Sequence, residues 1–410
     1  MIIFNMRSCR NWRRLFPLLL LLVPVLIAAK EPDADLDDMY KGVAAYMTDP
    51  ANHPDLARGV VNIEYGDAKV YGPAWVYLKD KSPPFSATAP ELAMADAMIK
   101  RYGEYFDRFD AAKLKSLSGD FDTLMHVAIG IEGVFKAYER DPKPEYRELI
   151  IRYLDMVKPV AKHPSLIYNY HVQPYGPITV VAGAAWFYLS YPLTFGANDP
   201  RSAEYTRIGL DMLKKLDRLY DPKGKKYLYS IRPGYDFTYA YTNMVLVQAL
   251  VRAYVLTGDK SYYQRGLDIT ETMDRDLYNP GYQGYLAAED LGKYYRKYQK
   301  IGPQYNQEYM ALSAHNYIAY ACFALYEAGG FKDEFLIERA ERALSFQKRW
   351  LWDHKGRIEH HIERGKLADP KDYCGGCNFQ TLYNIVLLKH ALMKEPALNL
   401  AGSGPNRQQR

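Results

Sequence analysis

One pattern recurs in this chain: Leu277-Tyr278-Asn279-Pro280-Gly281-Tyr282, followed by Gly284-Tyr285-Leu286. Its counterparts are Leu219-Tyr220-Asp221-Pro222-Lys223-Gly224 with Tyr227-Leu228-Tyr229, and Leu351-Trp352-Asp353-His354-Lys355-Gly356 with Ile358-Glu359-His360. In each, Asp or Asn stops a helix, Gly permits a positive φ, and a short extended stretch follows. Another apolar helix comes next, at a period of about 55–75 residues, which is typical of arrays of helical hairpins.

The helices on either side of these turns are of two kinds. Residues 245–251 and 318–325 are apolar nearly all round, which predicts helices buried on every side, whereas residues 205–215 are amphipathic. Helical patterns cover 89–99, 122–139, 144–160, 178–191, 202–219, 239–256, 260–276, 308–328, 332–351 and 378–393. An apolar inner ring inside an amphipathic outer ring predicts an all-α, (α/α)6-type toroid with short β-hairpin or extended loops on one face. An open superhelical solenoid is the alternative.

The corner Tyr254-Val255-Leu256-Thr257-Gly258-Asp259-Lys260-Ser261-Tyr262 joins an inner helix to an outer one. Gly258 suits the C′ position of the first helix and Asp259 the N-cap of the second. The corner resembles the hairpin corners of the α/α-toroid superfamily, that is, six-hairpin glycosidases and N-acylglucosamine epimerase-like proteins. The resemblance spans about residues 90–393 and implies the toroid fold. It does not fix an activity, since this fold hosts hydrolases, lyases, epimerases and non-catalytic proteins.

The N-terminus resembles an export signal. Arg7, Arg10, Arg13 and Arg14 precede the apolar run Leu15–Ala29, and Lys30-Glu31-Pro32 follows. Such a run is shorter than the about twenty apolar residues that a transmembrane helix needs. Residues 1–29 are therefore expected to be a signal peptide, or else an uncleaved N-terminal anchor, and the mature protein to be periplasmic or secreted.

The remaining domain boundaries follow from composition and charge. We expect an N-terminal arm, irregular or with a short helix, and a first irregular segment over 30–87, the toroid over 88–395, and a disordered tail over 396–410. Loss of the four signal arginines would lower the formal charge from +5 to +1, which gives no case for nucleic-acid binding. A membrane contact is expected only through the N-terminal segment, if it is retained.

Four cysteines bear on the compartment. Cys374 and Cys377 form Cys-Gly-Gly-Cys, which in an exported protein predicts a small disulfide loop, while Cys9 lies in the signal and Cys322 in an apolar helix. A βαβ context for a thioredoxin-like motif and further ligands at zinc spacing are both missing. No metal and no cofactor are expected.

The candidate site follows from the toroid itself. Inner helices run roughly parallel, so their N-terminal ends and the preceding loops meet on one face. Tyr is combined with Asn, Asp, Glu or His at 168–175, 232–243, 304–309 and 372–378. Residues 119–122 carry two Asp beside Phe121, and residues 315–316 are His-Asn. Aromatic faces pack on sugar rings, and carboxylates and amides bind hydroxyl groups, so the composition favours a carbohydrate site.

The candidate catalytic residues are the titratable groups at these helix starts: Glu308, Asp236, His171, Asp120 and His315. The candidate substrate-binding residues are Asn169, Tyr175, Arg232, Tyr239, Tyr241, Asn243 and Tyr305. Two carboxylates would suit glycoside hydrolysis. Asn169, His171 and Tyr175 are similar to the Asn/His-bearing motif of alginate-lyase-like toroids. Each Asp also suits a helix N-cap, and many Tyr simply fill space between helices.

These features together predict an exported carbohydrate-active enzyme, either a glycoside hydrolase or a uronate lyase, acting on a poly- or oligosaccharide. A sugar epimerase of the same fold is one alternative. A non-catalytic polysaccharide-binding or assembly protein of the cell envelope is another, since no family's catalytic motif is complete.

Overall fold

The computed structural model describes residues 36–49, 51–52, 131–139, 142–162, 176–231, 236–290, 309–363, 366–367 and 375–400. Its helices are α2 (Asp37–Thr48), α8 (Pro144–Ala161), α9 (Gly176–Phe195), α10 (Ser202–Leu216), α11 (Ala240–Thr257), α12 (Lys260–Asp276), α14 (Leu312–Ala328), α15 (Glu334–Phe346) and α16 (Gly375–Leu392). A further helical stretch covers 131–139. None of the helices in this part of the chain has the length and apolar character needed to span a bilayer.

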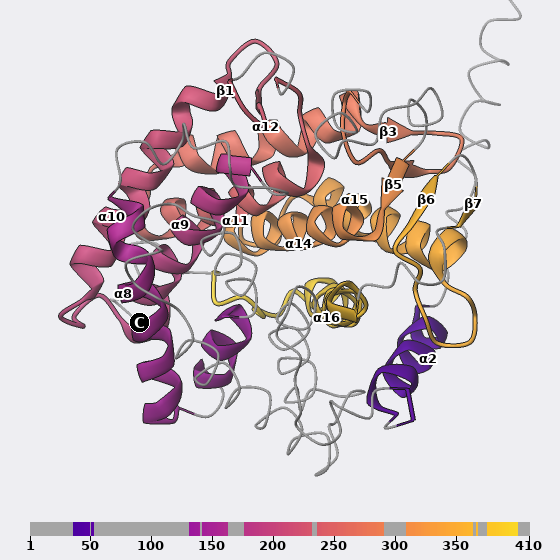
Figure 1. Cartoon of the computed structure of the whole chain (residues 1–410), viewed down its shortest axis with the longest axis horizontal. Coiled ribbons are helices and arrows are strands. Elements are labelled where there is room, and N and C mark those ends of the chain that lie inside the picture. The colour runs from indigo at the N-terminus through magenta and orange to yellow at the C-terminus, as the bar shows by residue number, and fades with distance from the viewer. Residues whose placement is uncertain are drawn as a thin grey trace, which may run out of the picture.

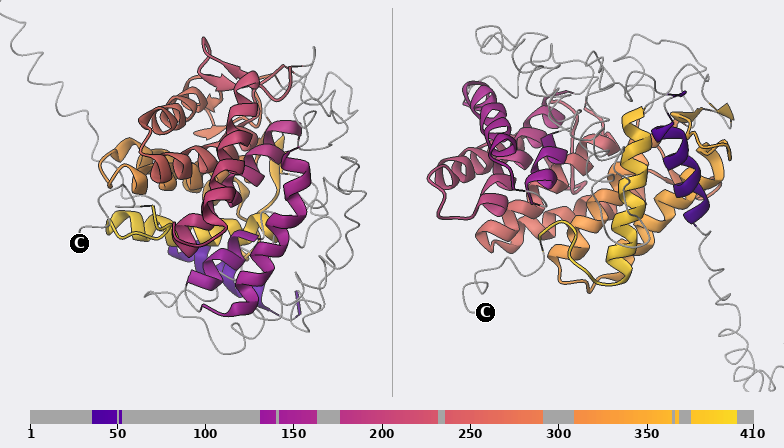
Figure 2. Two further views of the ribbon diagram at one scale, coloured as in Figure 1. Left: turned by 90° about the vertical axis from the view of Figure 1, so that its left-hand side faces the viewer. Right: turned by 90° about the horizontal axis from the view of Figure 1, so that it is seen from below.

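The helices form the two predicted rings. Along the inner ring α9 packs on α11, α11 on α14, and α14 on α16, while α10, α12 and α15 each pack outside the inner helix that precedes them (Figures 1 and 2). The inner helix α11 is buried from Ala240 to Ala253, whereas the outer helix α12 buries only one face, centred on Ile269 and Met273. The (α/α) toroid prediction is confirmed.

The corner between α11 and α12 is built as expected. Gly258 adopts φ 73°, and its N–H donates to the carbonyl of Tyr254 at 2.8 Å. Asp259 caps α12 by accepting from the Ser261 N–H at 2.9 Å. Left-handed glycine followed by an acidic N-cap lets the chain reverse within two residues.

Each repeated turn forms a small antiparallel hairpin. β1 (Tyr220–Asp221) pairs with β2 (Lys226–Tyr227), β3 (Tyr278–Asn279) pairs with β4 (Gly284–Tyr285), and Trp352 bridges Ile358. The predicted reason for the glycines is wrong in the first two turns. The positive-φ residues there are Lys225 at 55° and Gln283 at 52°. Gly224 instead provides room, since a Cβ on it would lie 2.4 Å from Asp221 Oδ2.

Both ends of the described chain are fixed by contacts with the toroid. Within the expected arm, α2 buries Met39, Val43 and Met47 and packs on α16, where Lys389 pairs with Asp37. Within the expected tail, three backbone N–H groups of residues 397–400 donate to the Glu327 carboxylate. The predicted tail boundary at 396 is therefore too early. Residues 1–29, most of the arm and residues 401–410 lie outside the described part.

Candidate functional site

Extended segments join side by side where the inner helices begin. The Ala240 N–H donates to the Ala287 carbonyl at 2.9 Å, and the Glu289 N–H donates to the Thr238 carbonyl at 3.1 Å. The Ala287 N–H donates in turn to the Tyr309 carbonyl at 2.9 Å. We call this arrangement the rim belt; it comprises residues 236–240, 286–290, 309–312 and 360–363.

The rim belt continues into a three-stranded sheet. β5 (Tyr309–Ala311) pairs with β6 (His361–Glu363), which pairs with β7 (Lys366–Leu367). The Leu312 N–H, at the start of α14, donates to the His360 carbonyl at 2.8 Å. The start of α14 and the chain that leads towards α16 are thus locked together (Figure 1).

The belt brings an imidazole pair and a phenol together. The ring centroids of Tyr309 and His361 are 4.7 Å apart. The Nδ1 atoms of His360 and His361 are 3.1 Å apart, which requires a proton between them. The sequence contains both histidines, but their contact with Tyr309 depends on strand pairing across some fifty intervening residues, which a sequence pattern does not reveal.

Three tyrosines lie at the starts of α11 and α14. The ring centroids of Tyr239 and Tyr241 are 6.0 Å apart, and those of Tyr241 and Tyr317 are 4.6 Å apart in an edge-to-face arrangement. All three side chains are buried. The sequence singled out Tyr239 and Tyr241 as sugar contacts; in the structure both rings are packed in the core, Tyr239 from within the rim belt and Tyr241 from the start of α11.

Two of the predicted site residues hold hairpins instead. The Asn243 side chain accepts from the Tyr227 N–H at 3.0 Å and donates to the Tyr227 carbonyl at 2.9 Å. His315 Nε2 accepts from the Tyr285 N–H at 2.9 Å, and Nδ1 donates to the Ala311 carbonyl at 2.8 Å. These bonds use the polar atoms of both side chains, so the substrate-binding prediction for Asn243 and the catalytic one for His315 are wrong.

The environment of His315 agrees with this structural role. Its ring is fully buried and stacks on Phe346, with centroids 4.0 Å apart. Burial lowers the pKa of His315 to about 4, although the bond to the Ala311 carbonyl works in the opposite direction. The imidazole is therefore neutral at physiological pH and accepts from a backbone N–H.

Asn378 plays the same part in the third hairpin, and the sequence interpretation missed it. Its side chain accepts from the Ile358 N–H at 2.9 Å and donates to the Ile358 carbonyl at 3.0 Å. Asn243, His315 and Asn378 each occupy the fourth position of an inner helix. That shared position was the available signal.

The other predicted site residues have different outcomes. Asp236 begins the rim belt and is exposed. Cys377 is disulfide-bonded, whereas Cys322 is a free, buried thiol. The residues that lie outside the described part are Asp120, Asn169, His171, Tyr175, Arg232, Tyr305, Glu308 and Cys374. The pairing of Cys374 with Cys377 stays a prediction.

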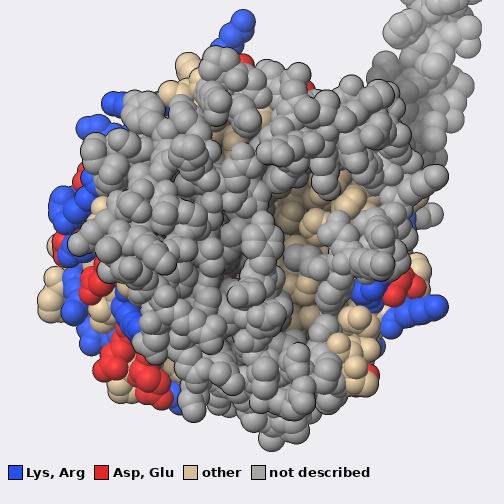
Figure 3. Space-filling model, viewed as in Figure 1, with Lys and Arg blue, Asp and Glu red and all other residues tan. Residues whose placement is uncertain are grey.

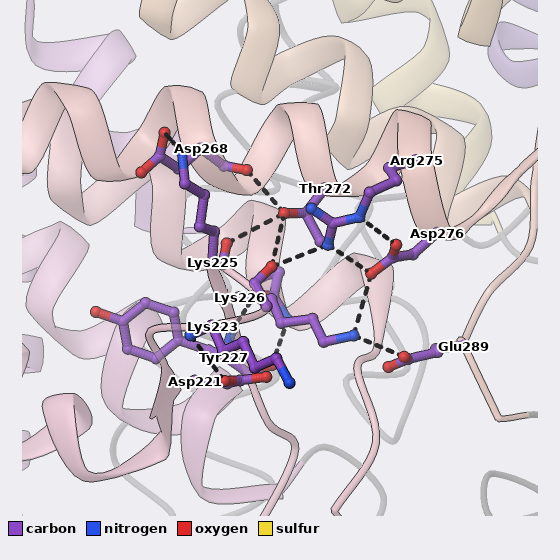
Figure 4. Close-up of polar contacts among 12 residues, drawn as sticks. Asp221, Lys223, Lys225, Lys226, Tyr227, Asp268, Thr272, Arg275, Asp276 and Glu289 are labelled. Atoms are coloured by element: carbon purple, nitrogen blue, oxygen red, sulfur yellow. Dashed lines mark hydrogen bonds and ion pairs between the residues drawn. The ribbon is translucent and has the colours of Figure 1, made fainter.

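One carboxylate of the belt is held by a buried cation. Lys226 Nζ lies 2.6 Å from Glu289 Oε1 and 3.1 Å from Asp276 Oδ2 (Figure 4). Burial acts to lower the pKa of Lys226, but hydrogen bonds to Glu289 and Asp276 raise it above its usual value. Lys226 therefore stays charged and fixes Glu289 against the first hairpin.

The interior of the ring contains a second charged group. The Arg252 guanidinium lies 5.1 Å over the Trp186 ring and donates to Ser190 Oγ at 2.8 Å. Burial raises the pKa of the nearby Glu132 to about 8, against the opposing effects of Arg252 and Lys136. All these groups are buried. They are remote from the start of α11, because Arg252 lies in its last turns.

The face seen in Figure 1 is hollowed. In the space-filling view of the same face, the described residues visible in the hollow to the right of centre are uncharged (Figure 3). Described Lys, Arg, Asp and Glu gather at the left and right edges instead.

No protein-family model matches the sequence, and neither does any curated protein. Solved structures match the fold. A sugar epimerase from a ruminal bacterium aligns over 86% of this chain and 98% of its own, with TM-score 0.58 and 10% identity. An unsaturated glucuronyl hydrolase from Bacillus sp. GL1 aligns over 80% and 86%, with TM-score 0.57 and 13% identity. A polysaccharide lyase aligns over 88% and 98%, with TM-score 0.54 and 13% identity. These likenesses establish the α/α toroid fold.

Proposed function

We propose that the protein is an exported carbohydrate-active enzyme that acts on a poly- or oligosaccharide at the rim belt. The observation that carries this proposal is the grouping of Tyr309, His360 and His361 at the start of α14. Aromatic rings bind sugar faces, and imidazole and phenol groups transfer protons near neutral pH. The fold neighbours, an epimerase, a glucuronyl hydrolase and a polysaccharide lyase, all act on sugars by their names.

Asp236 and several residues outside the described part extend this proposal. Glu308 directly precedes Tyr309, and Asp236 opens the first segment of the rim belt. We assign acid or base roles to Glu308, Asp236, Asp120 and His171. The substrate contacts that we assign are Asn169, Tyr175, Arg232 and Tyr305.

Export to the periplasm or beyond is part of the proposal. Residues 1–29 have the composition of a signal peptide, with a membrane anchor as the alternative. A disulfide at Cys377 supports an oxidising compartment, because disulfides persist there and are rare in reducing cytosol. N-terminal sequencing of the mature protein from fractionated cells tests this part: a start near residue 30 in the soluble fraction supports cleavage.

The activity is tested with purified protein on a panel of neutral and acidic polysaccharides. Hydrolysis releases reducing ends, elimination also produces an ultraviolet-absorbing double bond, and epimerisation incorporates solvent deuterium without chain cleavage. Glycan-array binding is measured in parallel. Turnover on any member supports an enzyme, whereas binding without turnover favours the non-catalytic alternative. If the protein neither binds nor turns over any member of the panel, the proposal is refuted.

A further inference from the structure

We infer that the interior of the inner ring binds a small monovalent anion, a halide, beside Arg252. The site lies among α9, α11 and α14, which pack on one another in that order. Arg252 is assigned as the charged ligand, and Gln248 and Tyr320 as neutral hydrogen-bond donors. The site is remote from the rim belt, so this inference does not depend on the proposed function.

Arg252 is a buried cation whose hydrogen bonds all go to neutral oxygens. The residue is 4% exposed; its Nε donates to Ser190 Oγ at 2.8 Å, and its Nη1 donates to the Gln248 carbonyl and Oε1 at 3.0 Å. Within the described chain, no carboxylate forms an ion pair with it. Burial lowers the pKa of Arg252 to about 10, so the guanidinium stays charged near pH 7. A buried charge is costly unless an opposite charge lies close to it.

The carboxylates around Arg252 do not supply that charge. Glu132, Glu139 and Glu327 all act on it electrostatically. Glu139 Oε2 lies 2.8 Å from Lys136 Nζ, and the Glu327 carboxylate accepts three backbone N–H groups near the end of the described chain. Burial raises the pKa of Glu132 to about 8, so this carboxyl group is mostly neutral at pH 7. Two of the acids are therefore compensated elsewhere, and the third is protonated.

Two neutral donors near the guanidinium also need an acceptor. Gln248 Nε2 and the Tyr320 hydroxyl are fully buried and have no hydrogen-bond partner. A guanidinium can only donate, so the Gln248 oxygen faces Arg252 and the amide nitrogen is left to another acceptor. The Tyr320 ring lies 5.7 Å from the Trp186 ring, and the Arg252 guanidinium carbon lies 5.1 Å over that same ring. Guanidinium, amide and phenol groups together suit an acceptor with negative charge.

The charge and the size of the ligand follow from these surroundings. One guanidinium compensates one negative charge, so a halide fits, whereas sulfate or phosphate would bring a second charge into a buried place. The buried Trp186 and Tyr320 rings leave no further cation on that side. A water molecule would satisfy the donors, but it would leave the charge of Arg252 uncompensated.

Halide binding should be linked to the proton on Glu132. Below about pH 8 the neutral Glu132 leaves the charge of Arg252 to the halide. Above that pH the Glu132 carboxylate compensates Arg252 and repels the halide, so halide affinity falls as the pH rises through about 8. The other charged or titratable groups that face Arg252 are Glu139 with its partner Lys136, Glu327 on α14 and Tyr383 on α16.

The test measures halide binding to the whole protein in two ways. Urea unfolding at pH 7 is compared in sodium chloride, sodium bromide and sodium gluconate of equal ionic strength, because gluconate is too large for a closed interior. At a halide concentration ten times its Kd, the ratio of folded to unfolded protein should be about tenfold higher than in gluconate. Anomalous scattering from crystals grown in sodium bromide should place bromide beside the Arg252 guanidinium.

Four variants assign the effect to this site. Arg252→Gln should unfold alike in chloride and gluconate. Arg207→Gln, the matched control on α10 with a 61% exposed side chain, should keep the halide dependence of wild type. Tyr320→Phe should raise the halide Kd about tenfold, as loss of one hydrogen bond to a charged group does. Glu132→Gln should bind halide equally at pH 7 and pH 9, whereas wild type should bind it more weakly at pH 9.

The outcomes decide the inference without any measurement of carbohydrate activity. Crystals in bromide that hold only water beside Arg252 overturn it. Equal stabilisation of wild type and folded Arg252→Gln by chloride does the same. If Arg252→Gln does not fold, Tyr320→Phe decides, because it removes one hydroxyl: a raised halide Kd supports the site, and an unchanged one overturns it.

Discussion

Acidification should remove a defined part of the stability of this toroid through His315. Its pKa is lowered from 6.5 to about 4 in the folded protein, chiefly by burial. The unfolded chain therefore binds a proton more readily than the folded one between these values. The stability that His315 contributes is complete above about pH 6.5 and falls as the pH drops towards 4. At 1.36 kcal/mol per pKa unit, the loss is about 2–3 kcal/mol between pH 7 and pH 4.5.

The variant His315→Gln isolates this effect. In the wild type the Tyr285 N–H donates to His315 Nε2 at 2.9 Å. Glutamine keeps an acceptor for this N–H but does not titrate. At pH 7 it should cost about 1–3 kcal/mol, because the ring that stacks on Phe346 is lost. That cost should shrink by about 2–3 kcal/mol at pH 4.5, since only the wild type weakens through this site.

Urea unfolding of both proteins at pH 7 and pH 4.5 provides the measurement. His354→Gln, on an exposed turn, controls for general loss of a histidine. If wild type and His315→Gln lose the same stability on acidification, to within about 0.5 kcal/mol, the argument from burial is refuted. A large fall in kcat for a fully folded His315→Gln would instead restore the catalytic role that the sequence suggested.

Three other predictions follow from buried groups. Burial raises the pKa of Glu132 to about 8, so the wild type loses stability as the pH rises from 4.5 through 8. The difference in unfolding free energy between Glu132→Gln and wild type should therefore shift in favour of the variant by about 3 kcal/mol between pH 5 and pH 8, as urea unfolding would show. Glu327→Gln should weaken the three backbone bonds to residues 397–400, with a cost of about 2 kcal/mol and faster amide exchange there. Iodoacetamide should leave native Cys322 unmodified, because burial raises its thiol pKa to about 12, and should label Cys377 only after reduction, as mass spectrometry would show.

Local chemistry explains what the sequence predicted well. The Gly258–Asp259 corner needs only a left-handed residue and an N-cap. Each of them acts on backbone groups that lie within a few residues along the chain. The two rings follow from helices that are apolar on all sides or on one side, as α11 and α12 are. Turns, caps and helix faces are encoded within a short window of sequence, so they can be predicted from it.

Structure that depends on distant partners was predicted less well. Residues 397–400 looked like a free tail, but Glu327 on α14 fixes them. The sequence left open whether the arm is irregular or a short helix, and α2 forms because it finds apolar cover on α16. Both segments gain order only from surfaces about seventy or more residues away, and local propensity does not include such contacts.

The errors at the candidate site come from side chains that hold the backbone of a hairpin in place. A polar residue one turn into an otherwise apolar inner helix attracts a functional interpretation, as His315 and Asn243 did. The inner helices α11, α14 and α16 are each preceded by a hairpin whose backbone groups would be buried without partners, and such groups are costly to leave unpaired. Asn243, His315 and Asn378 meet that requirement from the same helix position. Polar residues that recur in register with the repeat are thus explained by the fold. By the register of the three hairpins, the positions of His360 and His361 are occupied by Tyr229 and Ser230 in the first repeat and by Ala287 and Ala288 in the second. Neither repeat has a histidine there, so the argument for function is stronger where the repeat is broken.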